Sequence, residues 1–136
     1  MNNPEVIKTE NAPKAIGPYS QAINIFGLTF TSGQIPLDPL TGELISDNFQ
    51  DQVTQTLENI KGILDERKCG LKNIVKLTVY LTDLSKFNDL NMVFEDFWNK
   101  WFDGDELFYP SRSAIEVSKL PKDSQIEIEA IFKDVK

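Results

Sequence analysis

The sequence predicts an α+β fold in which two helices pack on a mixed sheet of about six strands. Two stretches, residues 47–70 and 83–101, carry apolar residues at steps of three and four, the spacing of an amphipathic helix. Two others, residues 74–82 and 125–132, alternate apolar and polar residues as one-sided strands do. Because a single strand separates the two helical stretches, helices and strands are expected to share one layered domain.

The N-terminal part of the chain is typical of short strands joined by ordered loops. Alternating and β-branched residues favour strands, whereas prolines and glycines interrupt them. The expected strands are 6–9, 20–25 and 28–32, the turn between the last two is Phe26-Gly27, and the loops are 11–19 and 35–42.

The first helix is expected to begin after an Asp47 N-cap and to end near Gly70, a residue suited to a left-handed cap. Arg67 lies late in this helix, where a cation interacts favourably with the helix dipole. The apolar positions at helical spacing form one row for burial against the sheet, namely Phe49, Val53, Leu57, Ile60 and Leu64.

The second helix follows the strand at residues 74–82 and begins at an Asp83 or Ser85 cap. It ends before the acidic stretch 103–106. Its large side chains need cover from the sheet or from another subunit. These side chains are Phe87, Leu90, Phe94, Phe97, Trp98 and Trp101. The strand that precedes this helix has its own apolar face, which is expected to consist of Val75, Leu77, Val79 and Leu81.

Two strands, 112–118 and 125–132, complete the fold around a turn at 120–123. In the last strand, alternate residues point to opposite faces of the sheet. Ile126, Ile128, Ala130 and Phe132 share one face, and Glu127, Glu129 and Ile131 share the other.

Composition excludes several classes of chemistry. The 136 residues fit one domain, 1–136. The chain has no histidine, so Ser-His-Asp and Cys-His catalysis and His-ligated metal sites are excluded. A net charge of -7 disfavours a general nucleic-acid binder, and we expect no nucleic-acid partner. Neither a phosphate-binding glycine loop nor a cysteine pair is present, so we expect no nucleotide or metal cofactor.

The same features indicate a cytoplasmic protein that does not interact with membranes. Cys69 is the single cysteine, which precludes an intrachain disulfide and suits a reducing compartment. No stretch approaches the ~20 apolar residues of a membrane span, and residues 1–5 lack the start of a signal peptide.

Arg112 is the residue with the clearest potential for chemistry. It follows Tyr109-Pro110-Ser111 and opens a strand of small and apolar residues, where a guanidinium needs a carboxylate or phosphate partner. The alternative is a salt bridge with one of the many acids of the chain. Glu127 and Glu129 lie on the same face of a strand. This face is either an ordinary solvated surface or a site in which one of the carboxylates, next to Arg112, binds a water molecule or transfers a proton.

Three blocks of sequence together resemble the RidA (YjgF) family of imine deaminases. They are 11–22 (NAPKAIGPYSQA), 31–36 (TSGQIP) and 110–130, which contains PSRSAIEV and IEIEA. The resemblance implies a chorismate mutase-like fold, with a mixed sheet and two helices on one face. It also implies a homotrimer with active sites between subunits that hydrolyse 2-iminobutanoate and 2-iminopropanoate to 2-keto acids and ammonia.

The resemblance also implies roles for seven residues. Arg112 matches the arginine that grips the substrate carboxylate, and Glu127 matches the acid that holds or activates water. The remaining matches are Tyr19 and Gly33 lining the cleft, Asn91 near it, and Ser32 and Ala114 in its wall.

This chain departs from the family pattern at two places. Ala114 stands where many members carry cysteine, so any activity is thiol-independent, and the segment 99–109 is longer than in typical members. Two other functions remain open at this stage. One is a non-catalytic trimer that binds 2-keto acids through Arg112, and the other is a ribonuclease or translation inhibitor.

Overall fold

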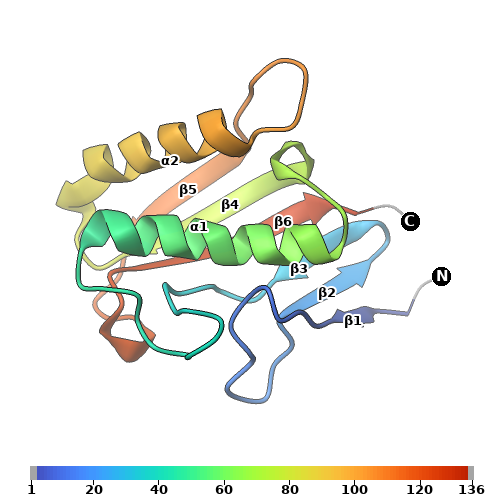
Figure 1. Cartoon of the computed structure of the whole chain (residues 1–136), viewed down its shortest axis with the longest axis horizontal. Helices are drawn as coiled ribbons and strands as arrows, with labels where there is room; N and C mark the ends of the chain where they lie inside the picture. Colours follow the sequence, from blue (N-terminus) through green and yellow to red (C-terminus); the bar gives the residue numbers. More distant parts are fainter. Residues whose placement is uncertain (1–2, 135–136) are drawn as a thin grey trace.

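The computed structural model describes residues 3–134, which form a six-stranded mixed sheet with two α-helices (Figure 1). The strands are β1 (Glu5–Ile7), β2 (Ala22–Ile25), β3 (Leu28–Thr31), β4 (Ile74–Leu81), β5 (Ser111–Glu116) and β6 (Ile126–Lys133). The helices are α1 (Phe49–Glu66) and α2 (Phe87–Trp101), with 3-10 turns η1 (Leu71–Asn73), η2 (Leu84–Lys86) and η3 (Pro121–Asp123).

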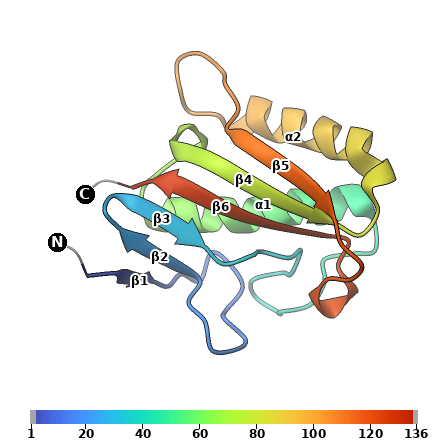
Figure 2. The ribbon, with the colours of Figure 1, turned by 180° about the vertical axis from the view of Figure 1, so that it is seen from behind.

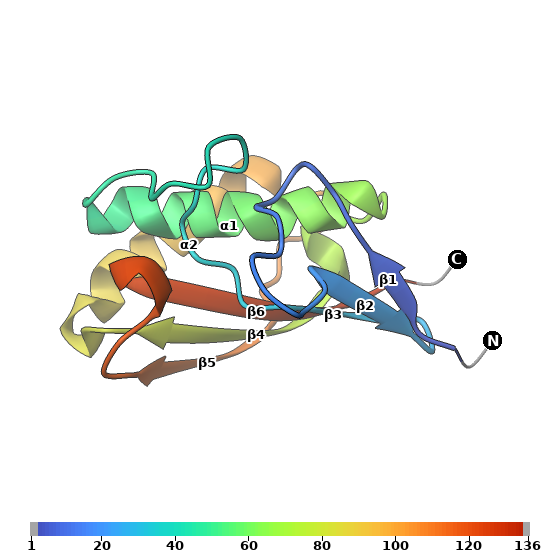
Figure 3. The same ribbon diagram turned by 90° about the horizontal axis from the view of Figure 1, so that it is seen from below.

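The strands are arranged in the order β1-β2-β3-β6-β4-β5. Only β4 and β5 pair in parallel, with α2 as the connection between them, and the other neighbours are antiparallel (Figure 2). Figure 3 shows both helices on the same side of the sheet, which leaves the other face without a helix. The predicted α+β class, the mixed sheet and its two helices on one face are therefore confirmed.

The core lies between the helices and the sheet. The apolar row predicted for α1 is buried, and so are the four residues Leu90, Phe94, Phe97 and Trp98 of α2. Phe87 and Trp101, the first and last residues of α2, are 39% and 38% exposed in the single chain, so their cover by another subunit stays a prediction.

The ends of α1 differ from the prediction in their capping residues. Asn48, not Asp47, is the N-cap, and its side chain accepts a hydrogen bond from the Asp51 backbone N–H at 2.9 Å. The left-handed residue after the helix is Lys68 (φ 57°), not Gly70. A Cβ at Gly70 would collide with the Asp103 carboxylate, so glycine permits a close approach there rather than a turn.

The first residues of β4 also differ from the predicted alternation. The pairing of β4 with β6 shifts between Ile74 and Lys76, as at a β-bulge. Ile74 therefore enters the core at 2% exposure, whereas Val75, predicted on the buried face, is 47% exposed. From Leu77 onward the predicted alternation holds.

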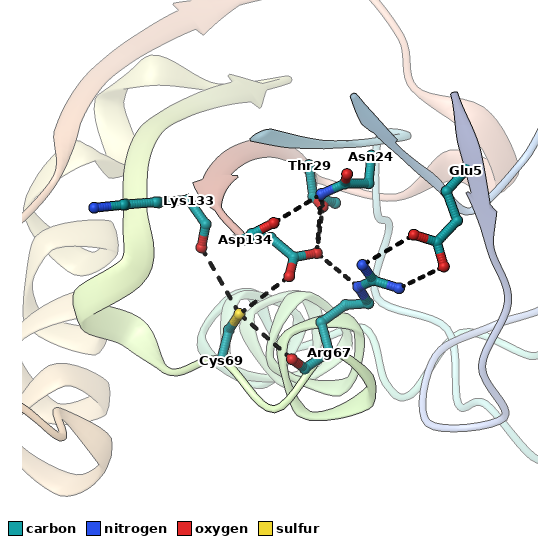
Figure 4. A network of polar contacts seen from close by, with 7 residues as sticks. All are labelled: Glu5, Asn24, Thr29, Arg67, Cys69, Lys133 and Asp134. Carbon is teal, nitrogen blue, oxygen red and sulfur yellow. Dashed lines mark hydrogen bonds and ion pairs between the residues drawn. The ribbon is translucent and has the colours of Figure 1, made fainter. Parts of the chain in front are cut away.

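Arg67, at the C-terminal end of α1, forms hydrogen bonds to residues in two other parts of the chain, β1 and the residue after β6 (Figure 4). Its Nε donates to the buried Asp134 carboxylate at 2.6 Å, and its other two nitrogens donate to Glu5 of β1 at 3.0 and 3.2 Å. Thr29 and Asn24 also donate to the Asp134 side chain. The Glu5 hydrogen bonds are the largest of the influences that raise the pKa of Arg67. Beyond its favourable place in the helix dipole, Arg67 thus joins α1 to β1 and to the residue after β6.

Candidate active site

Arg112 lies on the helix-bearing face of the sheet, beneath α2. It is the cross-strand partner of Leu77, which is fully buried, and such partners point to the same face. A guanidinium nitrogen of Arg112 donates to the Asn91 side-chain oxygen at 2.8 Å. The guanidinium carbon lies 5.0 Å from the ring centre of Phe94 and 5.3 Å from that of Phe87. Burial lowers the pKa of Arg112, but an arginine stays charged at neutral pH.

No carboxylate forms an ion pair with Arg112 among residues 3–134. The salt bridge considered as the alternative from composition is therefore not found in this part of the chain. The guanidinium instead borders a pocket of about 260 Å³, lined by Leu77, Asn91, Phe94, Glu95, Tyr109, Pro110 and Arg112. A partly buried cation beside an open pocket is suited to binding an anion from outside the chain.

Glu127 lies on the opposite, helix-free face of the sheet. Its neighbours on β6, Ile126 and Ile128, are buried in the core, so the alternation of the strand turns Glu127 away from the helices. Burial, and then the negative charge of Glu129, raise the pKa of Glu127 above that of an ordinary glutamate. A carboxyl group tuned in this way is a candidate for proton transfer.

Gly33 lies directly against the Glu127 carboxylate. A Cβ at this position would collide with the Oε2 atom of Glu127, so only glycine allows the two to approach so closely. The approach is fixed by a two-way backbone bridge, in which Gln34 donates to Ile128 at 2.8 Å and Ile128 donates to Gln34 at 3.0 Å. Gly33 thus lets the loop after β3 pack directly against the Glu127 side chain.

A second pocket, of about 360 Å³, brings together four of the residues predicted for the site: Tyr19, Ser32, Gly33 and Glu127. Sequence analysis did not single out Lys14, Gln21 or Gln34, which also line it. Gln21 orders the loop beside it by donating to the backbone oxygens of Thr9, Ala12 and Pro13. The position of Gln21 inside the first family-like block was the one available signal for it.

The chain does not bring Arg112 and Glu127 together. Arg112 pairs with Leu77, Glu127 pairs with Tyr80, and the two side chains project from opposite faces of the sheet. The predicted residues therefore form two groups, Arg112 with Asn91 and Glu127 with Tyr19, Ser32 and Gly33. Ala114 lines neither pocket, because it pairs with the buried Val79 and packs against the core.

Within the described residues, no group of three or more Cys, Asp or Glu residues is placed to hold a metal ion. No helix in the same part of the chain is long and apolar enough to cross a membrane.

Comparison with known proteins identifies the family. Residues 9–133 match the family described as Endoribonuclease L-PSP. This chain belongs to that family. Its structural neighbours include the YjgF protein of E. coli, so the resemblance to the RidA (YjgF) family is confirmed.

Individual members of the Endoribonuclease L-PSP family match the chain over nearly its whole length. The RutC family protein PH0854 of Pyrococcus horikoshii is 50% identical over 127 residues, which cover 93% of this chain and 95% of that protein. The 2-iminobutanoate/2-iminopropanoate deaminase of Salmonella typhimurium is 44% identical over 127 residues, with the same coverage of 93% and 95%. The crystal structure of E. coli TdcF with bound serine superposes with a TM-score of 0.87 at 41% identity, covering 96% of this chain and 99% of that one.

Proposed function

We propose that this protein hydrolyses short 2-imino acids, such as 2-iminobutanoate and 2-iminopropanoate, to 2-keto acids and ammonia. The observation that carries the proposal is Arg112, a partly buried cation that borders an open pocket and has no acid partner in the described chain. The name of the Salmonella relative, at 44% identity, supports the same reaction. These substrates carry one carboxylate, which a planar guanidinium can hold in a fixed orientation.

The reaction needs little more than a positioned water. A protonated C=N carbon is already electrophilic, so water adds to it directly and gives a carbinolamine. In our proposal Glu127 holds this water and accepts its proton, and then returns that proton to the carbinolamine nitrogen. The C–N bond breaks and ammonia leaves, while the hydroxyl group loses its proton to solvent and becomes the carbonyl of the 2-keto acid. Gly33 offers its backbone to the substrate. Tyr19, Ser32 and Asn91, which line the two pockets, are proposed as wall residues, and neither a cofactor nor a thiol takes part. Ala114 lines neither pocket in one chain, so its proposed place in the wall depends on the assembly of subunits.

This mechanism requires a second copy of the chain, because Arg112 and Glu127 occupy opposite faces of one sheet. We propose a homotrimer in which Arg112 of one subunit meets Glu127 of another. The helix-free face supports an interface of this kind, since Leu28, Phe30 and Ile115 are 36%, 43% and 45% exposed there. Light scattering is expected to give three times the chain mass of 15.5 kDa, and a monomeric mass would contradict the shared site.

A coupled assay tests the proposed reaction. A purified threonine dehydratase generates the enamine and imine in solution, and semicarbazide traps whatever imine remains. The wild-type protein is expected to lower semicarbazone formation, and Arg112→Ala to reduce this hydrolysis about 100- to 1000-fold, because the substrate loses its carboxylate anchor. Lys100→Ala removes an exposed cation of α2 and serves as the control. Equal rates for wild type and Arg112→Ala would refute the role of Arg112.

Binding of 2-keto acids without turnover is a second candidate, because it uses the same arginine. Glu127→Gln separates the two functions. If the protein is an enzyme, this variant loses turnover and still binds 2-keto acids through Arg112. If the wild type binds keto acids but hydrolyses no imine, the binding function is correct instead.

The family description also raises the cleavage of RNA as a function. The net charge of -7 opposes attraction of the phosphate backbone, so we do not favour this activity. We propose that the protein acts in the cytoplasm, a reducing compartment that suits a chain with the single cysteine Cys69.

A further inference from the structure

Three titratable side chains lie side by side on the helix-free face of β4 and β6. Tyr80 on β4 is the cross-strand partner of Glu127 on β6, and Glu129 lies two residues further along the same face. The Tyr80 hydroxyl lies 3.1 Å from the Oε1 atom of Glu129 and donates a hydrogen bond to it. The Tyr80 side chain therefore reaches from the backbone position opposite Glu127 to the carboxylate of Glu129.

Glu129 is the acid that shares the helix-free face of β6 with Glu127. On β6 the second acid is Glu129, and on β4 the titratable partner is Tyr80. The loop that faces Glu127 across the 360 Å³ pocket contributes Lys14 and Tyr19, while the groups beside Gly33 are neutral. Besides burial, only the charge of Glu129 contributes to the raised pKa of Glu127.

We propose that Tyr80 and Glu129 are positioning residues for Glu127, in which Tyr80 fixes the Glu129 carboxylate and Glu129 determines how readily Glu127 holds a proton. This inference rests on the proposed function, in which Glu127 takes a proton from water. A base of raised proton affinity is more effective near neutral pH than an ordinary glutamate. In this proposal Tyr80 acts through Glu129, since its hydroxyl donates to that carboxylate.

Two conservative substitutions isolate this arrangement. Glu129→Gln removes the charge at constant shape, and Tyr80→Phe keeps the ring but removes the hydroxyl. Without that hydroxyl, the Glu129 side chain can turn toward water, where its effect on Glu127 is more strongly screened. Glu58→Gln, on an exposed position of α1, makes the same charge change on the other side of the sheet and serves as the control.

The experiment is an NMR titration of the Glu127 side-chain carboxyl carbon, assigned by its absence in Glu127→Gln. The titration midpoint of Glu127 is expected to shift to lower pH in Glu129→Gln and to shift less, in the same direction, in Tyr80→Phe. The double variant is expected to match Glu129→Gln alone, because Tyr80 acts through Glu129. Glu58→Gln should leave the midpoint unchanged.

The rate of imine hydrolysis against pH gives a second readout. Hydrolysis rises with pH as Glu127 loses its proton, so the rising limb is expected at lower pH in Glu129→Gln. An unchanged Glu127 midpoint in Glu129→Gln, or additive effects of the two substitutions, would overturn the inference. A shifted midpoint in a protein that hydrolyses no imine would support the coupling and refute the proposed reaction, so the two failures are distinguishable. In the proposed trimer, Arg112 of another subunit also faces Glu127 and favours its charged form. This effect is common to wild type and variants, so the difference between them still reports the influence of Glu129.

Discussion

The two arginines of this chain lie in opposite kinds of surroundings. Arg67 donates to two carboxylates, Glu5 and Asp134, and its side chain is 12% exposed. Arg112 donates to the neutral amide of Asn91, and no acid of the described residues pairs with it. The comparison teaches that charge alone does not mark a functional arginine. What marks it is a partly buried guanidinium that no acid of the described residues pairs with.

The two arginines are also expected to differ in how much they contribute to the stability of the fold. The Asp134 side chain is fully buried and accepts hydrogen bonds from Arg67, Thr29 and Asn24. Removing Arg67 would take away a cation that lies 2.6 Å from this buried carboxylate, which is strongly destabilising. Removing Arg112 leaves no buried acid behind, because Asn91 is neutral. The first arginine is thus required for stability, whereas the second is available for a ligand.

The largest effect on stability is expected for Arg67→Ala. We expect it to lower the free energy of unfolding by about 3 kcal/mol, because it removes a cation that lies 2.6 Å from the buried Asp134 carboxylate. Arg112→Ala is the matched variant, with an expected loss below about 1 kcal/mol. Urea denaturation of both proteins measures the difference. Equal losses in the two variants would remove the distinction between the two arginines.

The sequence predicted the layered fold well because buried side chains repeat with the period of their element. The row from Phe49 to Leu64 and the alternation on β6 both follow this rule. Val75 was misplaced because a β-bulge shifts the pairing without altering the pattern of residues. Asp47 was predicted as the N-cap, although both Asp and Asn cap helices, because the sequence does not show which residue keeps an extended backbone before the first turn. In the structure this residue is Asn48, whose side chain accepts from the Asp51 backbone N–H.

The candidate site was less predictable, because its contacts join distant parts of the chain. The place of Arg112 at the start of a strand of small and apolar residues indicated a role in binding, but its hydrogen bond to Asn91 and its contact with Phe94 depend on how α2 crosses the sheet. The contact of Gly33 with Glu127 depends on the bridge from the loop after β3 to β6. The separation of the two groups onto opposite faces follows from strand register, which no local pattern reveals.

A carboxylate placed next to Arg112 would give it the kind of acid partner that Arg67 has. Asn91→Asp places a carboxylate where the amide now accepts the Arg112 hydrogen bond at 2.8 Å. The new ion pair is expected to compete with the substrate carboxylate and raise KM for the imine about 10-fold, which corresponds to roughly 1.4 kcal/mol. Steady-state kinetics check this, and Asn99→Asp, on an exposed position of α2, adds the same charge as a control. An unchanged KM in Asn91→Asp would mean that Arg112 does not bind the substrate carboxylate.

The smallest effect is expected at the outer arm of the Arg67 network. The Glu5 side chain is 60% exposed, although it receives two hydrogen bonds from Arg67 (Figure 4). Water and salt screen such a pair, so Glu5→Gln is expected to cost no more than about 0.5 kcal/mol, and less as ionic strength rises. Urea denaturation at two salt concentrations, beside Arg67→Ala, measures both quantities. A loss as large as that of Arg67→Ala would place the stabilising contact at Glu5, not at the buried Asp134. A small loss would show that Arg67 stabilises the fold mainly through the buried Asp134 and not through the exposed Glu5. Arg112 pairs with no such buried acid among the described residues.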